Sequence, residues 1–327
     1  MSRKRLLTGS FASLGIMILI LDGQTALSGA HAGLELCIKT VIPSLFPFFL
    51  LTILLTGSLS GCPLPFLRPI GKLCGIPKGA EGILLTGFLG GYPTGAQSVA
   101  SFYQSGQLRR DDAERMLSFC SNAGPAFLFG MVAPLFPDKT SAVLLWAVHI
   151  ISALLTAILI PSSQSGEVTV CHSREPSFSD AMRTSVIVMS TVCGWIIMFR
   201  VILAFLERWF LWMLPVALQV MITGILELSN GCCELIQVND PLLRFVLCSG
   251  MLAWGGLCVT LQTHSVASGL NIRSYLKGKI LQTLFSLLIS ASIVLGIWLS
   301  VTALVLLLAT IIQKTQKRSS NPATVGV

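Results

Sequence analysis

The sequence contains few charged residues. Asp, Glu, Lys and Arg together make up 11% of the 327 residues, whereas hydrophobic residues make up 53%. A typical water-soluble domain has about 25% charged residues. The low charge and the mean hydropathy of +0.80 exclude an ordinary soluble globular protein and predict that lipid surrounds most of the chain.

The sequence also lacks the motifs of common catalytic and metal sites. It has no GxSxG, HExxH, CxxC or GxxxxGK[ST] pattern, and its four histidines lie far apart. We therefore predict no enzymatic activity, no metal site and no cofactor. The net charge of +8 comes from short basic clusters between apolar runs, without aromatic interleaving, so we predict no nucleic-acid partner.

Apolar runs long enough to cross a bilayer recur along the chain, and a crossing helix needs about 20 residues. The basic start and the first apolar run are not followed by a clear cleavage site, so we expect an uncleaved first helix. These features predict an all-α polytopic membrane protein with about 8–10 membrane segments. The expected segments are 6–21, 38–60, 82–100, 116–136, 141–160, 184–206, 209–229, 242–262 and 280–312.

The distribution of basic residues predicts that segment 82–100 does not cross the membrane. Basic residues occur in 61–80 and in 101–115, and short basic loops favour the cytoplasmic side. Both loops lie on one side only if 82–100 enters the membrane and returns as a re-entrant hairpin. The Gly-Gly-Tyr-Pro-Thr-Gly motif at its centre suits such a reversal, because glycine permits unusual backbone angles and proline lacks an amide hydrogen.

The same reasoning predicts a second hairpin in the other half of the chain. Region 227–240 has acidic but no basic residues and is expected outside, whereas Arg273, Lys277 and Lys279 are expected in a final inside loop. Segment 209–229, with a turn at Ser-Asn-Gly, then forms a hairpin that opens to the opposite face from the first.

Two short internal similarities accompany these hairpins. Residues 85–89 resemble 222–226, and residues 119–121 resemble 247–249. Each half of the chain is therefore predicted to contain a span, a broken hairpin and a broken span. Two inverted repeats with discontinuous helices are typical of alternating-access transporters.

Polar residues at the interruptions of apolar helix are the candidate solute site. Pro125 cannot donate to the Ser121 carbonyl, so this oxygen, the Asn122 amide and the Thr94 hydroxyl are expected to converge on a solute or ion. The alternative is that these residues only kink and pack the helices. The full set of candidates is Gly91, Tyr92, Pro93, Thr94, Gly95, Ser121, Asn122, Pro125, Arg200, Glu227, Ser229 and Asn230.

Glu227 is the carboxylate of the candidate set. A carboxylate inside the membrane is costly and is by default a functional candidate. We expect it to bind a coupling proton or sodium ion or to pair with Arg200, unless it lies exposed at the tip of the hairpin. Arg200 itself could instead extend its charge toward the membrane surface.

Four stretches resemble the YlbJ family of sporulation integral membrane proteins, within the nucleoside-recognition or Gate-domain superfamily. They are GFLGGYPTGAQ, FCSNAGPAFLFG, GILELSNG and SGMLAWGGLCV. The resemblance implies paired Gate domains and transport of dipicolinic acid across the outer forespore membrane of a sporulating cell. A nucleoside or nucleobase transporter and a non-transport scaffold for spore assembly are the alternatives.

The chain is divided on these grounds into five parts. They are an N-terminal span with an amphipathic connection (1–37), a first Gate-like repeat (38–160), a cytoplasmic-type linker (161–183), a second Gate-like repeat (184–279) and a C-terminal membrane region with a basic tail (280–327). The expected partners are a small solute and the lipid bilayer. The sequence leaves the oligomeric state open, and it also leaves open whether 280–312 crosses once or twice.

Overall fold

The computed structural model describes residues 3–59, 62–161 and 177–297, and these residues form helices and no β-strand. Most of the predicted linker 161–183 and the chain after residue 297, including residues 298–312 of the segment 280–312, lie outside the described residues. The helices are α1 (Arg3–Leu21), α2 (Gly23–Leu36), α3 (Ile42–Ser58), α4 (Arg68–Leu73), α5 (Glu81–Leu89), α6 (Thr94–Gln104), α7 (Arg110–Cys120), α8 (Pro125–Phe127), α9 (Lys139–Leu159), α10 (Phe178–Trp209), α11 (Val216–Leu226), α12 (Leu228–Glu234), α13 (Pro241–Trp254), α14 (Gly256–Val266) and α15 (Arg273–Val294). Short π and 3-10 turns occupy Cys37–Val41, Leu128–Val132, Ala133–Leu135, Leu211–Met213 and Leu235–Gln237.

Six helical stretches in the described part of the chain are long and apolar enough to cross a membrane. Two shorter apolar helices, Arg5–Leu21 and Val216–Leu226, add to them. The prediction of an all-α polytopic membrane protein is confirmed. The six stretches are Gly23–Ser58, Arg110–Leu135, Thr140–Leu159, Phe178–Trp209, Pro241–Val266 and Arg273–Val294.

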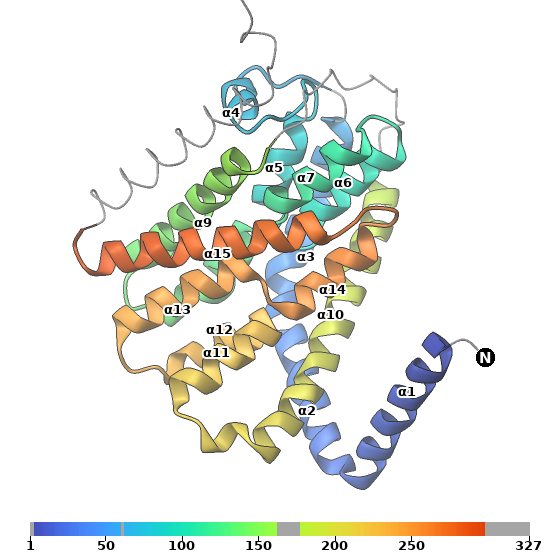
Figure 1. Cartoon of the computed structure of the whole chain (residues 1–327), viewed down its shortest axis with the longest axis vertical. Helices are drawn as coiled ribbons and strands as arrows, with labels where there is room; N and C mark the ends of the chain where they lie inside the picture. Colours follow the sequence, from blue (N-terminus) through green and yellow to red (C-terminus); the bar gives the residue numbers. More distant parts are fainter. Residues whose placement is uncertain (1–2, 60–61, 162–176, 298–327) are drawn as a thin grey trace, which may run out of the picture.

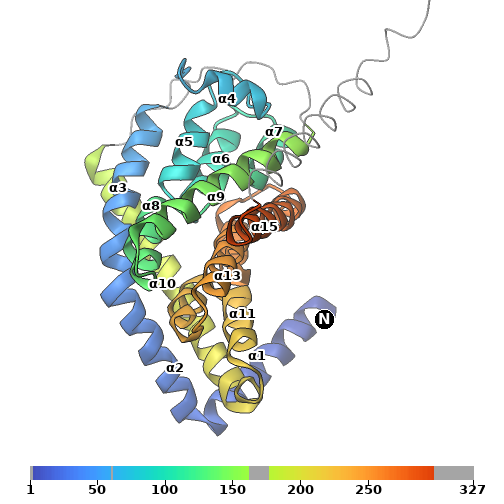
Figure 2. The same ribbon diagram turned by 90° about the vertical axis from the view of Figure 1, so that its left-hand side faces the viewer.

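The longest helices form one side of the molecule. Helices α2 and α3, joined by a π-helical turn, run beside α10, while α1 projects away from the body (Figures 1 and 2). A Cβ atom on Gly29 would lie 2.9 Å from the Cα of Val201, so α2 packs almost backbone to backbone on α10. The amphipathic connection predicted before residue 38 is therefore a helix that continues into the next span.

The predicted hairpins are broken helices, and two other spans are broken as well. The first hairpin pairs α5 with α6 across residues 90–93, and the second pairs α11 with α12 across Glu227. A stretch without helix at 121–124 separates α7 from α8, and α13 ends at Gly255, directly before α14. The membrane faces to which the hairpins open remain a prediction.

Two local expectations were wrong. The predicted Ser-Asn-Gly turn lies inside α12, and the helix instead breaks at Glu227, whose carboxylate caps the start of α12. The predicted loop at Arg273, Lys277 and Lys279 is the first part of α15, which lies across α7, α9 and α13 (Figure 1). Tyr275, Gly278 and Lys279 in this part of α15 are buried against neighbouring helices, and this packing stabilises a helix despite the basic residues.

Candidate functional site

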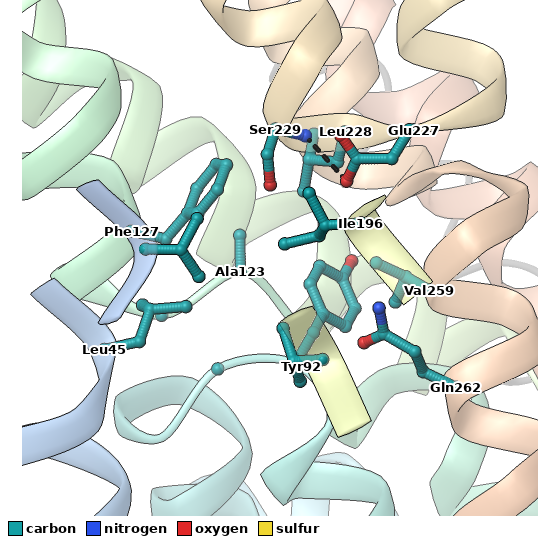
Figure 3. Close-up of a pocket in the computed structure, with 14 residues that line it drawn as sticks. Leu45, Tyr92, Ala123, Phe127, Ile196, Glu227, Leu228, Ser229, Val259 and Gln262 are labelled. Carbon is teal, nitrogen blue, oxygen red and sulfur yellow. Dashed lines mark hydrogen bonds between the residues drawn. The ribbon is translucent and has the colours of Figure 1, made fainter. Parts of the chain in front are cut away.

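Three of the four helix breaks line one cavity, and the fourth, at Gly255, lies against the Tyr92 ring. The cavity wall includes Gly91 and Tyr92 from the first hairpin break, Gly124 from the α7–α8 break, and Glu227 from the second hairpin break. Side chains of α3, α8, α10 and α14 complete the wall, among them Leu45, Phe127, Ile196, Val259 and Gln262 (Figure 3). The cavity measures about 30 Å³, which is room for a water molecule or two rather than for an organic solute.

Tyr92 forms one end of the cavity and links the two halves of the chain. Its ring lies at the cavity wall beside Gln262 (Figure 3). Its hydroxyl donates to the Leu252 carbonyl of α13 at 3.2 Å and accepts a hydrogen bond from Lys279 at 2.8 Å. The first hairpin break is thereby attached to both α13 and α15.

Lys279 is a buried cation held by neutral groups. Its side chain on α15 has 0% exposure, and its ammonium donates to the Tyr92 hydroxyl, to the Ser121 carbonyl at 2.5 Å and to Gln282 Oε1 at 2.9 Å. The ammonium also lies 4.9 Å from the centroid of the Tyr92 ring, where a cation–π attraction adds to the hydrogen bonds. All three donors of the ammonium are satisfied without a carboxylate.

A glycine next to Lys279 sets its position. A Cβ atom on Gly278 would lie 2.2 Å from the Ser118 carbonyl oxygen of α7, far inside a normal contact. Only a residue without a side chain allows α15 to approach α7 this closely. The close approach brings the Lys279 ammonium within reach of the carbonyl that the α7–α8 break leaves free.

Side chains also satisfy other groups of the α7–α8 break. Gln282, one turn after Lys279, donates to Asn122 Oδ1 at 2.9 Å. His149 of α9 accepts from the Ala123 amide through Nε2 at 3.1 Å. The α7–α8 break is therefore held by a polar layer from α9 and α15, which removes the large cost of unpaired backbone groups in an apolar environment.

Glu227 forms the end of the cavity opposite Tyr92 (Figure 3). Its side chain accepts from the Ser229 amide at 3.1 Å, from the Asn230 amide at 2.6 Å and from Asn230 Nδ2 at 2.7 Å. Glu227 is 1% exposed, so the alternative of an exposed carboxylate at the hairpin tip does not hold. No residue of the described chain forms an ion pair with it.

The predicted convergence of Thr94, Asn122 and the Ser121 carbonyl was wrong in part. The Ser121 carbonyl is free of the helix, as expected from Pro125 at the start of α8, but it accepts from Lys279. The Thr94 hydroxyl instead donates to the Gly91 carbonyl, and the Asn122 amide donates to the Phe119 carbonyl. Both side chains therefore support the breaks from behind the cavity wall.

The other predicted residues divide between the cavity and its surroundings. Gly91, Tyr92, Glu227 and Ser229 line the cavity, and Asn230 contacts it through its bonds to Glu227. Pro93 precedes α6 and Gly95 lies in the first turn of that helix, buried outside the wall. Arg200 lies one helical turn beyond Ile196 and pairs with Glu207, so the suggested Arg200–Glu227 pair is wrong.

The sequence analysis missed Lys279, Gln282, His149 and Gln262. The signal for the first two is their spacing, because Lys279, Gln282, Ser286 and Ser290 recur every three to four residues, as on one face of a helix, and all four are buried. His149 and Gln262 are isolated polar residues in apolar spans. Only the three-dimensional arrangement places them beside a helix break or the cavity.

The fold and the cavity define a multi-pass helical membrane protein with a small internal polar site between broken helices. Comparison with known proteins finds similarity to YlbJ, a sporulation integral membrane protein of Bacillus subtilis strain 168, at 27% identity over 316 residues. The match covers 82% of this chain and 77% of YlbJ, which supports a relation to YlbJ-like proteins. No family model and no solved structure matches the chain.

The described residues contain no group of three or more His, Cys, Asp or Glu side chains that could hold a metal ion. The cavity combines the Glu227 carboxylate, the Tyr92 and Ser229 hydroxyls and the Gln262 amide, with the Lys279 ammonium nearby. These groups can form hydrogen bonds and charge interactions with a small polar group.

Proposed function

We propose that the chain is a membrane transporter of a small anionic solute, and that the solute is dipicolinic acid, moved across the outer forespore membrane during sporulation. The observation that carries the proposal is the meeting of three helix breaks at one cavity inside a membrane protein. Discontinuous helices around an internal site are the arrangement by which many secondary transporters bind their substrates. The similarity to a sporulation membrane protein supports the biological setting.

Charge favours an anionic solute. Dipicolinate is a planar dianion, and the Lys279 ammonium, which has no carboxylate partner among the described residues, lies directly behind the cavity wall. The small cavity volume is consistent with a closed conformation. Transport then requires the hairpins to move apart, first toward one side of the membrane and then toward the other.

Glu227 is the proposed site of the coupling ion. It faces the cavity without a cationic partner in the described chain, and a proton or a sodium ion would offset its charge. One monovalent cation that enters with the dianion would halve the net charge brought into the membrane.

A nucleoside is the second candidate solute. The amides of Gln262 and Asn230 and the Glu227 carboxylate lie at or beside the cavity, and such groups can bind ribose hydroxyls and base edges. A role in spore assembly without transport is the third candidate, and it requires no solute in the cavity.

Uptake into liposomes tests the proposal. Purified protein should take up dipicolinate in preference to uridine and adenosine. Nucleoside preference would support the second candidate, and absence of any uptake by correctly inserted protein would support a scaffold. In cells, deletion should give spores deficient in dipicolinate that recover when dipicolinate is supplied externally, whereas an assembly defect would not be rescued in this way.

A further inference from the structure

Lys279, like Glu227, differs from the other buried charged residues of the described chain. Buried Glu81 pairs with Arg68 and buried Asp112 pairs with Arg109. Arg115 donates to carbonyl oxygens near the ends of α4 and α9, including those of Cys74 and Ala157, where the helix dipole is negative. Lys279 alone among these cations is completely buried and bonded to residues of the cavity wall and of the neighbouring break.

A buried ammonium is costly unless its charge is compensated. Three neutral acceptors satisfy its hydrogen bonds but supply no opposite charge. A glutamine or methionine would fill this space at a lower desolvation cost. An anion that reaches this side chain would supply the missing opposite charge and favour its protonated form.

The route to the ammonium passes through Tyr92. The Tyr92 ring is part of the cavity wall, and its hydroxyl lies between the Lys279 ammonium and the Leu252 carbonyl. When the hydroxyl moves away from the ammonium, one donor of the ammonium becomes free for an incoming oxygen.

We propose that Lys279 and Tyr92 form the carboxylate-binding end of the cavity, which selects solutes that carry a carboxylate over neutral solutes of the same shape. This inference rests on the proposed transport function and assigns the recognition of the solute's charge to Lys279 and Tyr92. The carboxylate accepts from the Lys279 ammonium and from the Tyr92 hydroxyl. Glu227, at the opposite end (Figure 3), excludes a second free anion there unless its own charge is offset by the coupling cation.

The test compares two solutes of the same shape. Pyridine-2,6-dicarboxylate and its neutral 2,6-dicarboxamide are offered to protein in liposomes, and uptake rates and Kd values are measured. Wild-type protein should prefer the dicarboxylate. Lys279→Met should reduce this preference roughly ten- to hundredfold, the range for one charge-assisted contact, and Tyr92→Phe should reduce it by a smaller factor.

Lys277→Met is the matched control, because Lys277 has the same chemistry two residues earlier on α15 but is exposed. It should leave the preference unchanged. If Lys279→Met does not insert or fold, Lys279→Gln, which retains hydrogen-bond donors without charge, decides in its place. Lys279→Arg should keep part of the preference, because it retains the charge in an altered shape.

The outcomes separate this inference from the proposed function. Dicarboxylate uptake with an unchanged preference in folded Lys279→Met or Lys279→Gln overturns the assignment of Lys279 and leaves the transport function standing. Wild-type protein that takes up neither compound but takes up nucleosides overturns the proposed function, and this inference with it. Loss of preference only in the Lys279 and Tyr92 variants supports both.

Discussion

Replacement of Glu227 by glutamine separates the charge of this residue from its structural role. The carboxylate accepts two hydrogen bonds from Asn230 through Oε2 and one from Ser229 through Oε1. A glutamine whose side-chain oxygen faces Asn230 keeps both hydrogen bonds from Asn230. Its amide group then faces the Ser229 amide, which loses its acceptor.

The expected cost to stability is therefore that of one hydrogen bond to a charged group, about 1.5–3 kcal/mol. This is smaller than the stability of a typical domain, about 5–15 kcal/mol, so the variant should insert and fold. If Glu227 binds the coupling ion, transport should nevertheless fall by at least about tenfold, which corresponds to about 1.4 kcal/mol. For a coupling proton, the dependence of uptake on pH should also become flatter.

The assay measures initial dipicolinate uptake in liposomes at several pH values, at matched amounts of inserted protein. Glu234→Gln is the control, because Glu234 lies at the other end of α12 and does not line the cavity. Wild-type rates and an unchanged pH profile in Glu227→Gln would refute the reasoning and leave Glu227 as a helix cap only. A variant that fails to insert would show that the carboxylate is needed for the fold itself.

Two further predictions concern packing and topology. Gly278→Val should destabilise the protein by about 1–3 kcal/mol, the usual cost of overpacking, measured as a lower Tm in detergent, whereas Gly194→Val, at a position with no atom within 4 Å of the added Cβ, should change it little. A wild-type Tm for the Gly278 variant would contradict the close α7–α15 contact. Cysteines introduced into 61–80 and 101–115 should be labelled from the same face of the membrane, and those in 230–240 from the other; opposite labelling of the first two loops would make the first hairpin an ordinary span.

The all-α fold class and the positions of several helix breaks could be predicted from the sequence, because each depends on local chemistry. The spans are apolar enough to be identified by the mean hydropathy of a 20-residue window. The Gly-Gly-Tyr-Pro motif and Pro125 favour helix breaks locally, because proline lacks the amide hydrogen of a helical bond and glycine permits unusual backbone angles. The structure places breaks at both.

The chemistry of the site was harder to predict because it depends on distant contacts. Lys279 lies in a basic stretch with Arg273 and Lys277, and hydropathy treats all three alike. Its burial depends on the close approach of α15 to α7 at Gly278, which no local window reveals. Conversely, Thr94 and Asn122 were predicted as solute ligands because they are polar residues at breaks, yet their first partners are the carbonyls of their own breaks.

Under the proposed transport function, the side chains that hold the breaks by hydrogen bonds would also contact the solute, and this would link binding to motion. The buried ionisable groups around the cavity each satisfy a group that an interrupted helix leaves free: Lys279 binds the Ser121 carbonyl, His149 the Ala123 amide, and Glu227 the Ser229 amide. A solute or ion that binds one of these side chains would weaken the hydrogen bond between that side chain and the break. Because unpaired backbone groups are costly inside a membrane, the break then rearranges until its groups are satisfied again. Under the proposed function, binding at the cavity would therefore change the geometry of the hairpins directly, without a separate element to transmit the change.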